Sequence, residues 1–158
     1  MFKGRDGIFF ILGSFGMFII PLAYVFSTKL DFADYYLPAY TGWLGAPLFA
    51  FALWFLWRSH ADLGKNFSPV SEIKEGQTLV TGGVYSKIRH PMYSAHFLWA
   101  IAQVLLLHNY IAGTSFLVTF FPFYFHRVGR EEEMMAEEFG DEYREYMKST
   151  GRIIPKIR

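Results

Sequence analysis

Residues 91–126 read PMYSAHFLWAIAQVLLLHNYIAGTSFLVTFFPFYFH, and these 36 residues contain no Asp, Glu, Lys or Arg. A helix needs about 20 apolar residues to cross the hydrocarbon core of a bilayer, so the stretch is too long for one span. Its most polar point, His108–Asn109, lies near the middle. The stretch therefore predicts a helical hairpin, with spans at about 92–107 and 111–126 and a turn at His108–Asn109.

Two further uncharged runs precede this hairpin. They cover residues 8–26 and 35–57 and predict spans at about 8–27 and 41–58. Charged residues make up 18% of the 158-residue chain, below the roughly 25% of soluble domains. No small-residue cleavage site follows the first run, so we expect an uncleaved span. The sequence predicts an all-α integral membrane protein: a single domain, 1–158, with four transmembrane helices and a cytoplasmic C-terminal amphipathic helix.

Basic residues predict which side of the membrane each connection faces, because Lys and Arg concentrate on the cytoplasmic side. They precede the first span, follow the second in the loop at 59–90, and follow the fourth in the tail at 127–158. The connection at 28–40 has one Lys against two Asp residues. We therefore expect both termini to be cytoplasmic. We also expect loop 59–90 and tail 127–158 to fold together into one pocket at the membrane surface.

The tail contains REEEMMAEEFGDEYREYMK at 130–148, a pattern typical of an amphipathic helix. Its apolar stripe consists of Met135, Phe139, Tyr143 and Tyr146. Its wet face carries Glu133, Glu137, Asp141 and Arg144. Gly140 weakens a helix by about 1 kcal/mol relative to Ala, which need not break it. Residues three or four apart share a face, so Glu131 and Glu132 extend the apolar stripe. Inward carboxylates are costly unless paired, which leaves two interpretations: they bind a cationic ligand, or Arg127 and Arg130 neutralise them.

A second polar cluster precedes the third span, where residues 87–93 read KIRHPMY. Pro91 suits the first turn of a helix and keeps His90 out of that helix. Arg89 and His90 are therefore expected in a loop at the helix start. The preceding Gly82–Gly83 pair permits close backbone approach to a ligand. The residues alone leave two alternatives: Arg89 and His90 anchor and cap the helix end, or they hold a charged ligand.

Two motifs in fixed order resemble those of the isoprenylcysteine carboxyl methyltransferase and phospholipid methyltransferase superfamily. They are TGGVYSKIRHPMY at 81–93 and, after a helical hairpin, REEEMMAEEFGDEYREYMKSTGRIIP at 130–155. That superfamily carries Arg-His-Pro-x-Tyr at a helix start. It also carries a Glu pair eight and seven residues before the Phe of Phe-Gly, followed by a tail ending in Ile-Pro. The resemblance covers about residues 64–156, and the Glu pair falls on Glu131 and Glu132.

The resemblance implies a membrane methyltransferase of the prokaryotic type in a bacterial inner membrane, with S-adenosylmethionine as methyl donor and S-adenosylhomocysteine as product. The cofactor-binding residues that it implies are Gly82, Gly83, Tyr85, Arg89, His90, Pro91, Tyr93, Glu131, Glu132 and Tyr143. Catalytic roles fall to Glu132 and Arg130, and no metal is expected. The implied acceptor is a lipophilic small molecule or a lipid that enters from the bilayer. Carboxyl O-methylation of an isoprenylcysteine-like substrate is favoured over N-methylation of a phospholipid or amine.

The acceptor itself needs polar partners. Arg127 or Arg130 could hold an acidic acceptor or a lipid phosphate with a bidentate guanidinium. His96 lies inside the third span, where an ionisable side chain is either functional or part of a helix–helix hydrogen bond. We therefore expect Arg127, Arg130 and His96 as substrate-binding candidates.

Other classes of protein remain alternatives at this point. Five histidines make a haem- or quinone-binding four-helix membrane protein conceivable, although most of them fall at expected helix ends. A non-catalytic scaffold with the same fold is a third possibility. The net charge of +1 suggests no nucleic-acid partner, and the absence of cysteine excludes a disulfide or a thiolate nucleophile. Membrane lipids are expected partners, and nothing in the sequence supports a particular oligomer.

Overall fold

The computed structural model describes residues 5–66 and 76–156, and within them every regular element is a helix. Residues 67–75, which belong to the expected cytoplasmic loop, lie outside the described residues. The predicted all-α class is therefore confirmed for the described part of the chain. Extended pairing is limited there to two isolated bridges, Asp34 with Asn109 and Ile88 with Gly151.

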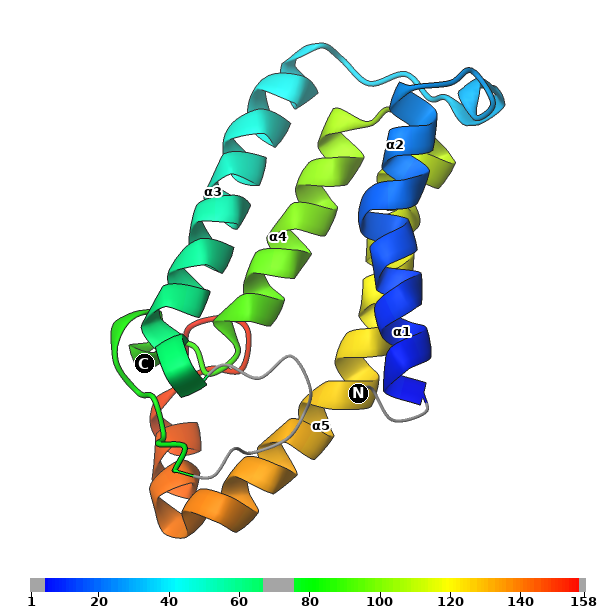
Figure 1. Ribbon diagram of the computed structural model, residues 1–158. Coiled ribbons are helices and arrows are strands. Elements are labelled where there is room, and N and C mark those ends of the chain that lie inside the picture. Colours follow the sequence, from blue (N-terminus) through cyan, green and yellow to red (C-terminus); the bar gives the residue numbers. More distant parts are fainter. Residues whose placement is uncertain (1–4, 67–75, 157–158) are drawn as a thin grey trace. The chain divides into compact units, whose positions relative to one another are not determined.

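The chain divides into two compact units. The first comprises Met1–Leu53 and His96–Tyr124, and the second comprises Trp54–Ala95 and Phe125–Arg158. Three long helices contribute residues to both units; they are α3 (Tyr40–Leu63), α4 (Pro91–Leu106) and α5 (Tyr110–Ser149) (Figure 1). The predicted span at 41–58 lies within α3, and the span at 111–126 lies within α5. The span at 92–107 lies in α4 except for its last residue.

The predicted hairpin turn is confirmed, because α4 ends at Leu106 and α5 begins at Tyr110. Asn109 supplies the N-cap of α5. Its side-chain Oδ1 accepts hydrogen bonds from the backbone N–H groups of Ile111 at 3.0 Å and Ala112 at 2.8 Å. These N–H groups have no partner inside the helix, so a short amide side chain at this position favours the helix start.

Asn109 also forms hydrogen bonds with residues 30 and 34 of the connection that leads into α3. Its Nδ2 donates to the Leu30 carbonyl at 2.6 Å and to Asp34 Oδ1 at 2.8 Å. The side chain is completely buried. Beside it, the Tyr35 hydroxyl donates to the Val104 carbonyl at 2.8 Å. A buried amide that satisfies both its donors and its acceptor explains why the turn falls on His108–Asn109.

The first predicted span, 8–27, is helical but not uniform. It consists of α1 (Arg5–Ser14), a π-helical turn η1 (Phe15–Ile19) and α2 (Ile20–Val25). Gly16 packs so closely on α5 that a Cβ there would overlap the Thr119 hydroxyl and the Ser115 backbone. The Gly16 carbonyl accepts hydrogen bonds from Gln103 Nε2 at 3.1 Å and Ser115 Oγ at 2.8 Å. The π turn therefore brings a backbone acceptor to two buried polar side chains of the neighbouring helices.

The tail differs from the prediction in its boundaries. The fourth span and the amphipathic helix, expected as separate elements, are joined in α5. The reason lies in the connecting residues, which are good helix formers such as Glu, Met and Ala. The interruption comes later, at Gly140, whose backbone angles are φ 56° and ψ −128°. Gly140 therefore does break the helical path, which the sequence pattern did not require, and only a residue without Cβ adopts these angles at low cost.

Two helices of the described chain are long and apolar enough to cross a membrane. They are Gly7–Val25 and Tyr40–Asn66. Most of their large apolar side chains are exposed, among them Phe18, Trp43 and Trp54. An exposed apolar surface of this kind suits contact with lipid. The number of four spans stays a prediction.

Candidate functional site

The segment Lys87–His90 is held by backbone hydrogen bonds to the C-terminal part of the tail. The Arg89 N–H donates to the Gly151 carbonyl at 2.9 Å, and the His90 N–H donates to the Arg152 carbonyl at 2.9 Å. In return, the Gly151 N–H donates to the Lys87 carbonyl at 3.1 Å. Pro91 begins α4 as predicted, so both Arg89 and His90 lie just outside the helix. The backbone of Arg89 and His90 is therefore held in place by the tail at Gly151 and Arg152.

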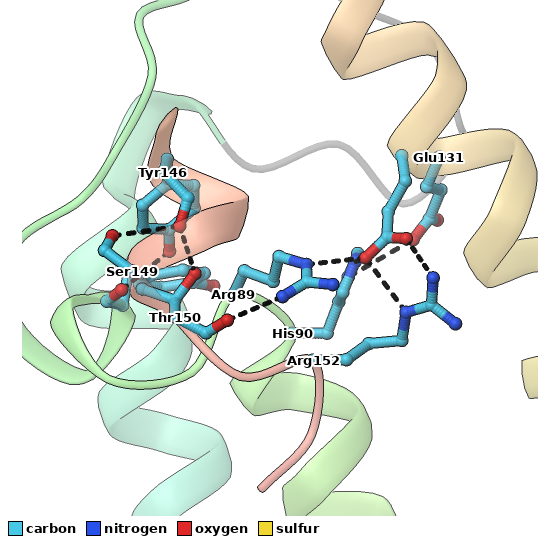
Figure 2. Close-up of polar contacts among 9 residues, drawn as sticks. Arg89, His90, Glu131, Tyr146, Ser149, Thr150 and Arg152 are labelled. Atoms are coloured by element: carbon cyan, nitrogen blue, oxygen red, sulfur yellow. Dashed lines mark hydrogen bonds and ion pairs between the residues drawn. The ribbon is translucent and has the colours of Figure 1, made fainter. Parts of the chain in front are cut away.

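These side chains converge on a carboxylate of α5. Arg89 Nε donates to Glu132 Oε1 at 2.6 Å, and His90 Nε2 lies 3.3 Å from the same oxygen. Arg152 Nε donates to Glu132 Oε1 at 3.0 Å, and its Nη2 donates to Oε2. In Figure 2 the side chains of Arg89, His90 and Arg152 point toward the turn of α5 that carries Glu131. Glu132 is thus shared among three cationic or titratable partners from two places in the sequence, residues 89–90 and residue 152.

Burial and hydrogen bonding change the pKa of Glu132 in opposite directions. Its side chain is 10% exposed, and burial by itself raises the pKa of a carboxyl group. Hydrogen bonds from His90, Arg152 and Arg89 outweigh this effect and hold the pKa of Glu132 well below its usual range. The group is therefore a carboxylate at neutral pH. A second bond from Arg89 Nη1 to the Thr150 carbonyl at 2.8 Å fixes the Arg89 guanidinium beside it.

The neighbouring Glu131 has a separate set of partners. Arg127 Nε donates to Glu131 Oε1 at 2.7 Å, and the Tyr93 hydroxyl donates to Oε2 at 2.8 Å. The ring of His90 stacks on that of Tyr93 with centroids 5.5 Å apart, and His90 Nδ1 lies 3.9 Å from Glu131 Oε2. His90 therefore lies between the two carboxylates, within hydrogen-bond distance of Glu132 and at the longer distance of 3.9 Å from Glu131.

The glycine loop before Arg89 is positioned by the end of α3. Asp62 Oδ2 accepts a hydrogen bond from the Val84 N–H at 2.9 Å, and its Oδ1 pairs with Arg58 at 2.8 Å. Gly83 starts the short 3-10 helix η4 (Gly83–Ser86) with φ 60°. A Cβ on Gly83 would overlap the Asp62 carboxylate. Glycine is therefore required here both for the backbone angle and for the close approach of Asp62.

Buried tyrosines complete this unit. The Tyr146 hydroxyl donates to the Tyr85 carbonyl at 2.6 Å, and the Tyr85 hydroxyl donates to the Ser59 carbonyl at 3.3 Å. Burial raises the pKa of Tyr146 to about 12. Burial, reinforced by the negative charge of Glu132, raises the pKa of Tyr143. These phenols therefore stay neutral and act as hydrogen-bond donors or as rigid walls.

The sequence matches the model of a known protein family. The sequence model of the isoprenylcysteine carboxyl methyltransferase (ICMT) family matches residues 38–137, which is more than half of the chain. The chain belongs to the ICMT family. The match includes α3, Arg89, His90 and both inward carboxylates, and it ends before the Gly140 kink. The predicted family is therefore confirmed, and its phospholipid methyltransferase branch receives no specific support.

Named relatives agree with this family. The protein-S-isoprenylcysteine O-methyltransferase of Homo sapiens is 39% identical over 97 residues, which are 60% of this chain and 34% of the human protein. The Schizosaccharomyces pombe protein of the same name is 34% identical over 96 residues, 60% of this chain and 41% of that protein. The Arabidopsis thaliana protein-S-isoprenylcysteine O-methyltransferase B is 33% identical over 96 residues, 60% and 49% of the two chains. The chain spans 34% to 49% of the length of these curated relatives.

A solved structure shares the fold. The eukaryotic intramembrane Ras methyltransferase ICMT superposes with a TM-score of 0.67 at 24% sequence identity. The superposition covers 98% of this chain and 54% of that chain. At this identity the likeness of the ICMT-family chain to that structure concerns the fold alone.

The predicted site residues of this ICMT-family chain fall into groups. One cluster brings together Arg89, His90, Tyr93, Arg127, Glu131 and Glu132. The opposite acidic residues Glu133 and Glu137 are exposed, as the helical periodicity predicts. Pro91, Tyr85 and Tyr143 are buried in the same unit, and Gly82 and Gly83 are exposed there. Arg130 is exposed on α5.

His96 belongs to the other unit, where its ring stacks on Phe120 with centroids 5.2 Å apart. A role of His96 in substrate binding stays a prediction. Sequence reasoning missed two contributors to the cluster of the ICMT-family chain, Arg152 and Thr150. It also missed Asp62, which holds the glycine loop. Arg152 stands three residues before Pro155, inside the tail motif. A basic residue inside that motif is the sequence signal that could identify Arg152 as a partner of the inward carboxylates.

Proposed function

We propose that this chain transfers a methyl group from S-adenosylmethionine to the carboxylate of an isoprenylcysteine-like acceptor at a membrane surface. The observation that carries the proposal is the cluster around Glu132. Arg89 and His90 lie 42 to 43 residues away from Glu132 in sequence, yet all three meet in one buried ion network. They belong to the two motifs that resemble those of the family. Relatives named protein-S-isoprenylcysteine O-methyltransferase support the same choice of acceptor.

The residues present fit this methyl donor. Its methionyl end is a zwitterion with one ammonium and one carboxylate, and its sulfonium adds a second positive charge. The cluster offers carboxylates, guanidinium groups and a phenol within one short stretch of α5 and its partners. We infer that Glu131 and Glu132 orient the cationic end. Arg89, His90, Pro91 and Tyr93, with Tyr85 and Tyr143, form the adjoining wall, and the Gly82–Gly83 backbone lies beside it.

When bound, S-adenosylmethionine supplies a methyl group on a sulfonium, which is a good leaving group. An acceptor carboxylate is already anionic, so this chain needs no general base for the transfer. Its residues act by holding the two reactants and by placing charge near them. Arg130 is our candidate for holding the acceptor carboxylate, because its side chain is exposed whereas Arg127 is 8% exposed.

The proposal includes a membrane arrangement. Four spans, with both termini cytoplasmic, would put loop 59–90 and tail 127–158 on one side of the bilayer. A soluble cofactor then reaches the cluster from the cytoplasm, and a lipophilic acceptor reaches it from the bilayer. The basic residues that flank the spans support this orientation.

Two measurements on detergent-purified protein test the proposal. The first is calorimetric titration with S-adenosylhomocysteine, for which we expect micromolar binding. The second follows methyl transfer from S-adenosylmethionine to S-farnesylcysteine with a free carboxylate. The methyl ester of the same compound has its carboxylate already methylated and should remain unmodified, and phosphatidylethanolamine vesicles test N-methylation. Binding without transfer to S-farnesylcysteine would reject the acceptor, and absence of binding by folded protein would reject the enzyme class.

A further inference from the structure

Residues 26–39 connect the two helices that are long and apolar enough to cross a membrane. The first of these helices ends at Val25, and the second begins at Tyr40. The connecting segment is therefore joined directly to a span at each end. When both helices cross the bilayer, as in the proposed membrane arrangement, the segment lies at the membrane surface, between the hydrocarbon core and bulk water.

This segment directs large aromatic side chains away from the protein. Phe26 is 82% exposed, Phe32 is 79% exposed and Tyr36 is 94% exposed. Tyr40 and Trp43, in the first turns of α3, are exposed as well. Large apolar groups that gather on one exposed surface mark a site of interaction. Aromatic side chains with a polar tip are enriched where a membrane meets water, because the ring enters lipid while the tip still reaches water.

The backbone around Phe32 is internally hydrogen-bonded. Phe32 is the middle residue of the 3-10 turn η2 (Asp31–Ala33). The Leu30 carbonyl accepts the Ala33 N–H at 2.9 Å and also accepts Asn109 Nδ2 at 2.6 Å. Polar backbone groups that already have partners can enter a region poor in water at lower cost than groups without partners. The turn can therefore carry Phe32 into lipid without breaking these bonds.

Two adjacent tyrosines show which face of the segment belongs to the protein. The Tyr35 N–H donates to the His108 carbonyl at 2.9 Å, and the Tyr35 hydroxyl donates to the Val104 carbonyl at 2.8 Å. The segment is thereby attached to the turn between α4 and α5. Neighbouring side chains of an extended chain point in opposite directions, and Asp34 begins such a stretch. Tyr36 accordingly faces away from the helices.

The charges of the segment do not favour attraction to acidic lipids. It contains Lys29 against Asp31 and Asp34, whereas anionic headgroups attract segments with an excess of basic residues. Association with a membrane must then come from the aromatic and other apolar groups. Such association is not screened by salt, because screening acts on charges.

We propose that residues 26–39 form an aromatic anchor, which inserts Phe26, Phe32 and Tyr36 into the headgroup region of the bilayer. The partner is the phospholipid that surrounds the spans, either zwitterionic or anionic. The rings contact the upper part of the acyl chains, and the Tyr36 hydroxyl donates to a phosphate or ester oxygen of the lipid. The anchor depends on the proposed membrane arrangement, but methyl transfer to the acceptor does not require it.

Site-directed spin labelling tests the anchor, because the chain has no cysteine and each single-cysteine variant carries one label. F32C and Y36C report on the anchor itself. D31C is the matched control, an exposed polar position in the same turn. F15C marks an exposed position inside the first span, and E137C marks an exposed position in the tail. Circular dichroism shows that each variant is folded.

The labelled proteins are reconstituted in vesicles of phosphatidylcholine, with and without phosphatidylglycerol. Collisions of the label with oxygen, which concentrates in the acyl chains, and with a water-soluble nickel chelate measure its depth. We expect F32C and Y36C to lose nickel collisions and gain oxygen collisions relative to D31C and E137C. Their depth should approach that of F15C without reaching it. The order should be the same in both lipid mixtures and at low and high salt.

Four outcomes would overturn the anchor. Nickel collisions at F32C and Y36C equal to those at E137C would place the segment in water. Loss of both nickel and oxygen collisions there would show that protein, such as a second copy of this chain, covers the segment. Equal depth of D31C and F32C would show that the segment does not direct its rings into lipid. Dependence of the depth on salt would show that charge holds the segment at the surface.

The label at F15C separates the anchor from the arrangement on which it depends. Frequent nickel collisions at F15C would show that the first helix is not inside the bilayer. That result would reject the proposed membrane arrangement, and the anchor with it. Protection of F15C from nickel combined with exposure of F32C and Y36C would reject the anchor alone.

Discussion

Replacement of Glu132 by alanine removes the carboxylate that accepts hydrogen bonds from Arg89, His90 and Arg152. The matched control is E137A, a change of the same residue type on the same helix at an exposed position. We expect E132A to unfold more easily than wild type, and E137A to unfold like wild type. The reason is that the charge of Arg89, whose side chain is 12% exposed, loses its partner while it stays largely buried.

The magnitude follows from burial. Removal of one member of a buried ion pair costs about 3–5 kcal/mol, because the remaining charge is uncompensated. Arg152 is 46% exposed and can return to water, so its share is small. Arg89 keeps its bond to the Thr150 carbonyl. We therefore expect a loss near the lower limit, about 3 kcal/mol in the free energy of unfolding.

The assay is unfolding of detergent-solubilised protein, followed by far-ultraviolet circular dichroism at several pH values. The pKa of Glu132 is lowered in the folded protein, so its charged form stabilises the fold. That stabilisation is fully present above the ordinary carboxyl pKa of about 4.3 and is lost as pH falls toward the lower folded-state value. The difference between wild type and E132A should therefore be large at pH 7 and shrink below about pH 4.

Equal unfolding free energies of E132A and E137A at pH 7 would refute the description of Glu132 as a buried ion-pair centre. A constant difference between wild type and E132A from pH 7 down to pH 3 would refute the electrostatic reason. Calorimetry on the same samples adds the functional side: S-adenosylhomocysteine binding should be lost in folded E132A and kept in E137A.

Three other substitutions test individual features, all by the same unfolding assay unless stated. G140A should lower the free energy of unfolding by about 1–3 kcal/mol, because Gly140 has a positive φ. G129A, in open space within helical α5, should raise it by about 0.5–1 kcal/mol. Equal changes in the two variants would contradict the kink at Gly140. G16A should cost about 1–3 kcal/mol because the added methyl overlaps α5, and a neutral result would mean that the two helices are not in close contact. D62A should leave the Val84 amide without its acceptor, so that amide should exchange with solvent faster in D62A than in wild type, and unchanged exchange would reject the anchoring role of Asp62.

Local patterns were sufficient to predict most helices. Uncharged runs gave their approximate positions, and the polar pair His108–Asn109 gave the hairpin turn. In the structure Asn109 caps the helix that follows this turn. Periodicity placed Glu132 inward and Glu137 outward, and the burial of the two residues agrees. Such features depend on residues within a few positions of one another.

Two features could not be predicted because they depend on distant contacts. The break at Gly140 precedes the buried side chains of Tyr143 and Tyr146, and propensity alone allows the helix to continue there. The contribution of Arg152 depends on backbone pairing between residues 87–90 and 151–152. That pairing is too short to produce the alternating sequence pattern of a strand. The sequence therefore does not indicate which residues lie beside Arg152.

The same pairing sets an order in time. Arg89, His90 and Glu132 are synthesised before Gly151 and Arg152, which supply the backbone acceptors and the third partner of the Glu132 carboxylate. A ribosome adds about 5–20 residues per second, so a chain that has reached Glu132 needs about a second or more to gain residue 152. During that interval the helices can insert, but the cluster lacks its closing segment. Cofactor recognition would therefore begin only after the tail has paired with the start of α4. The site is thus completed late in the synthesis of the chain.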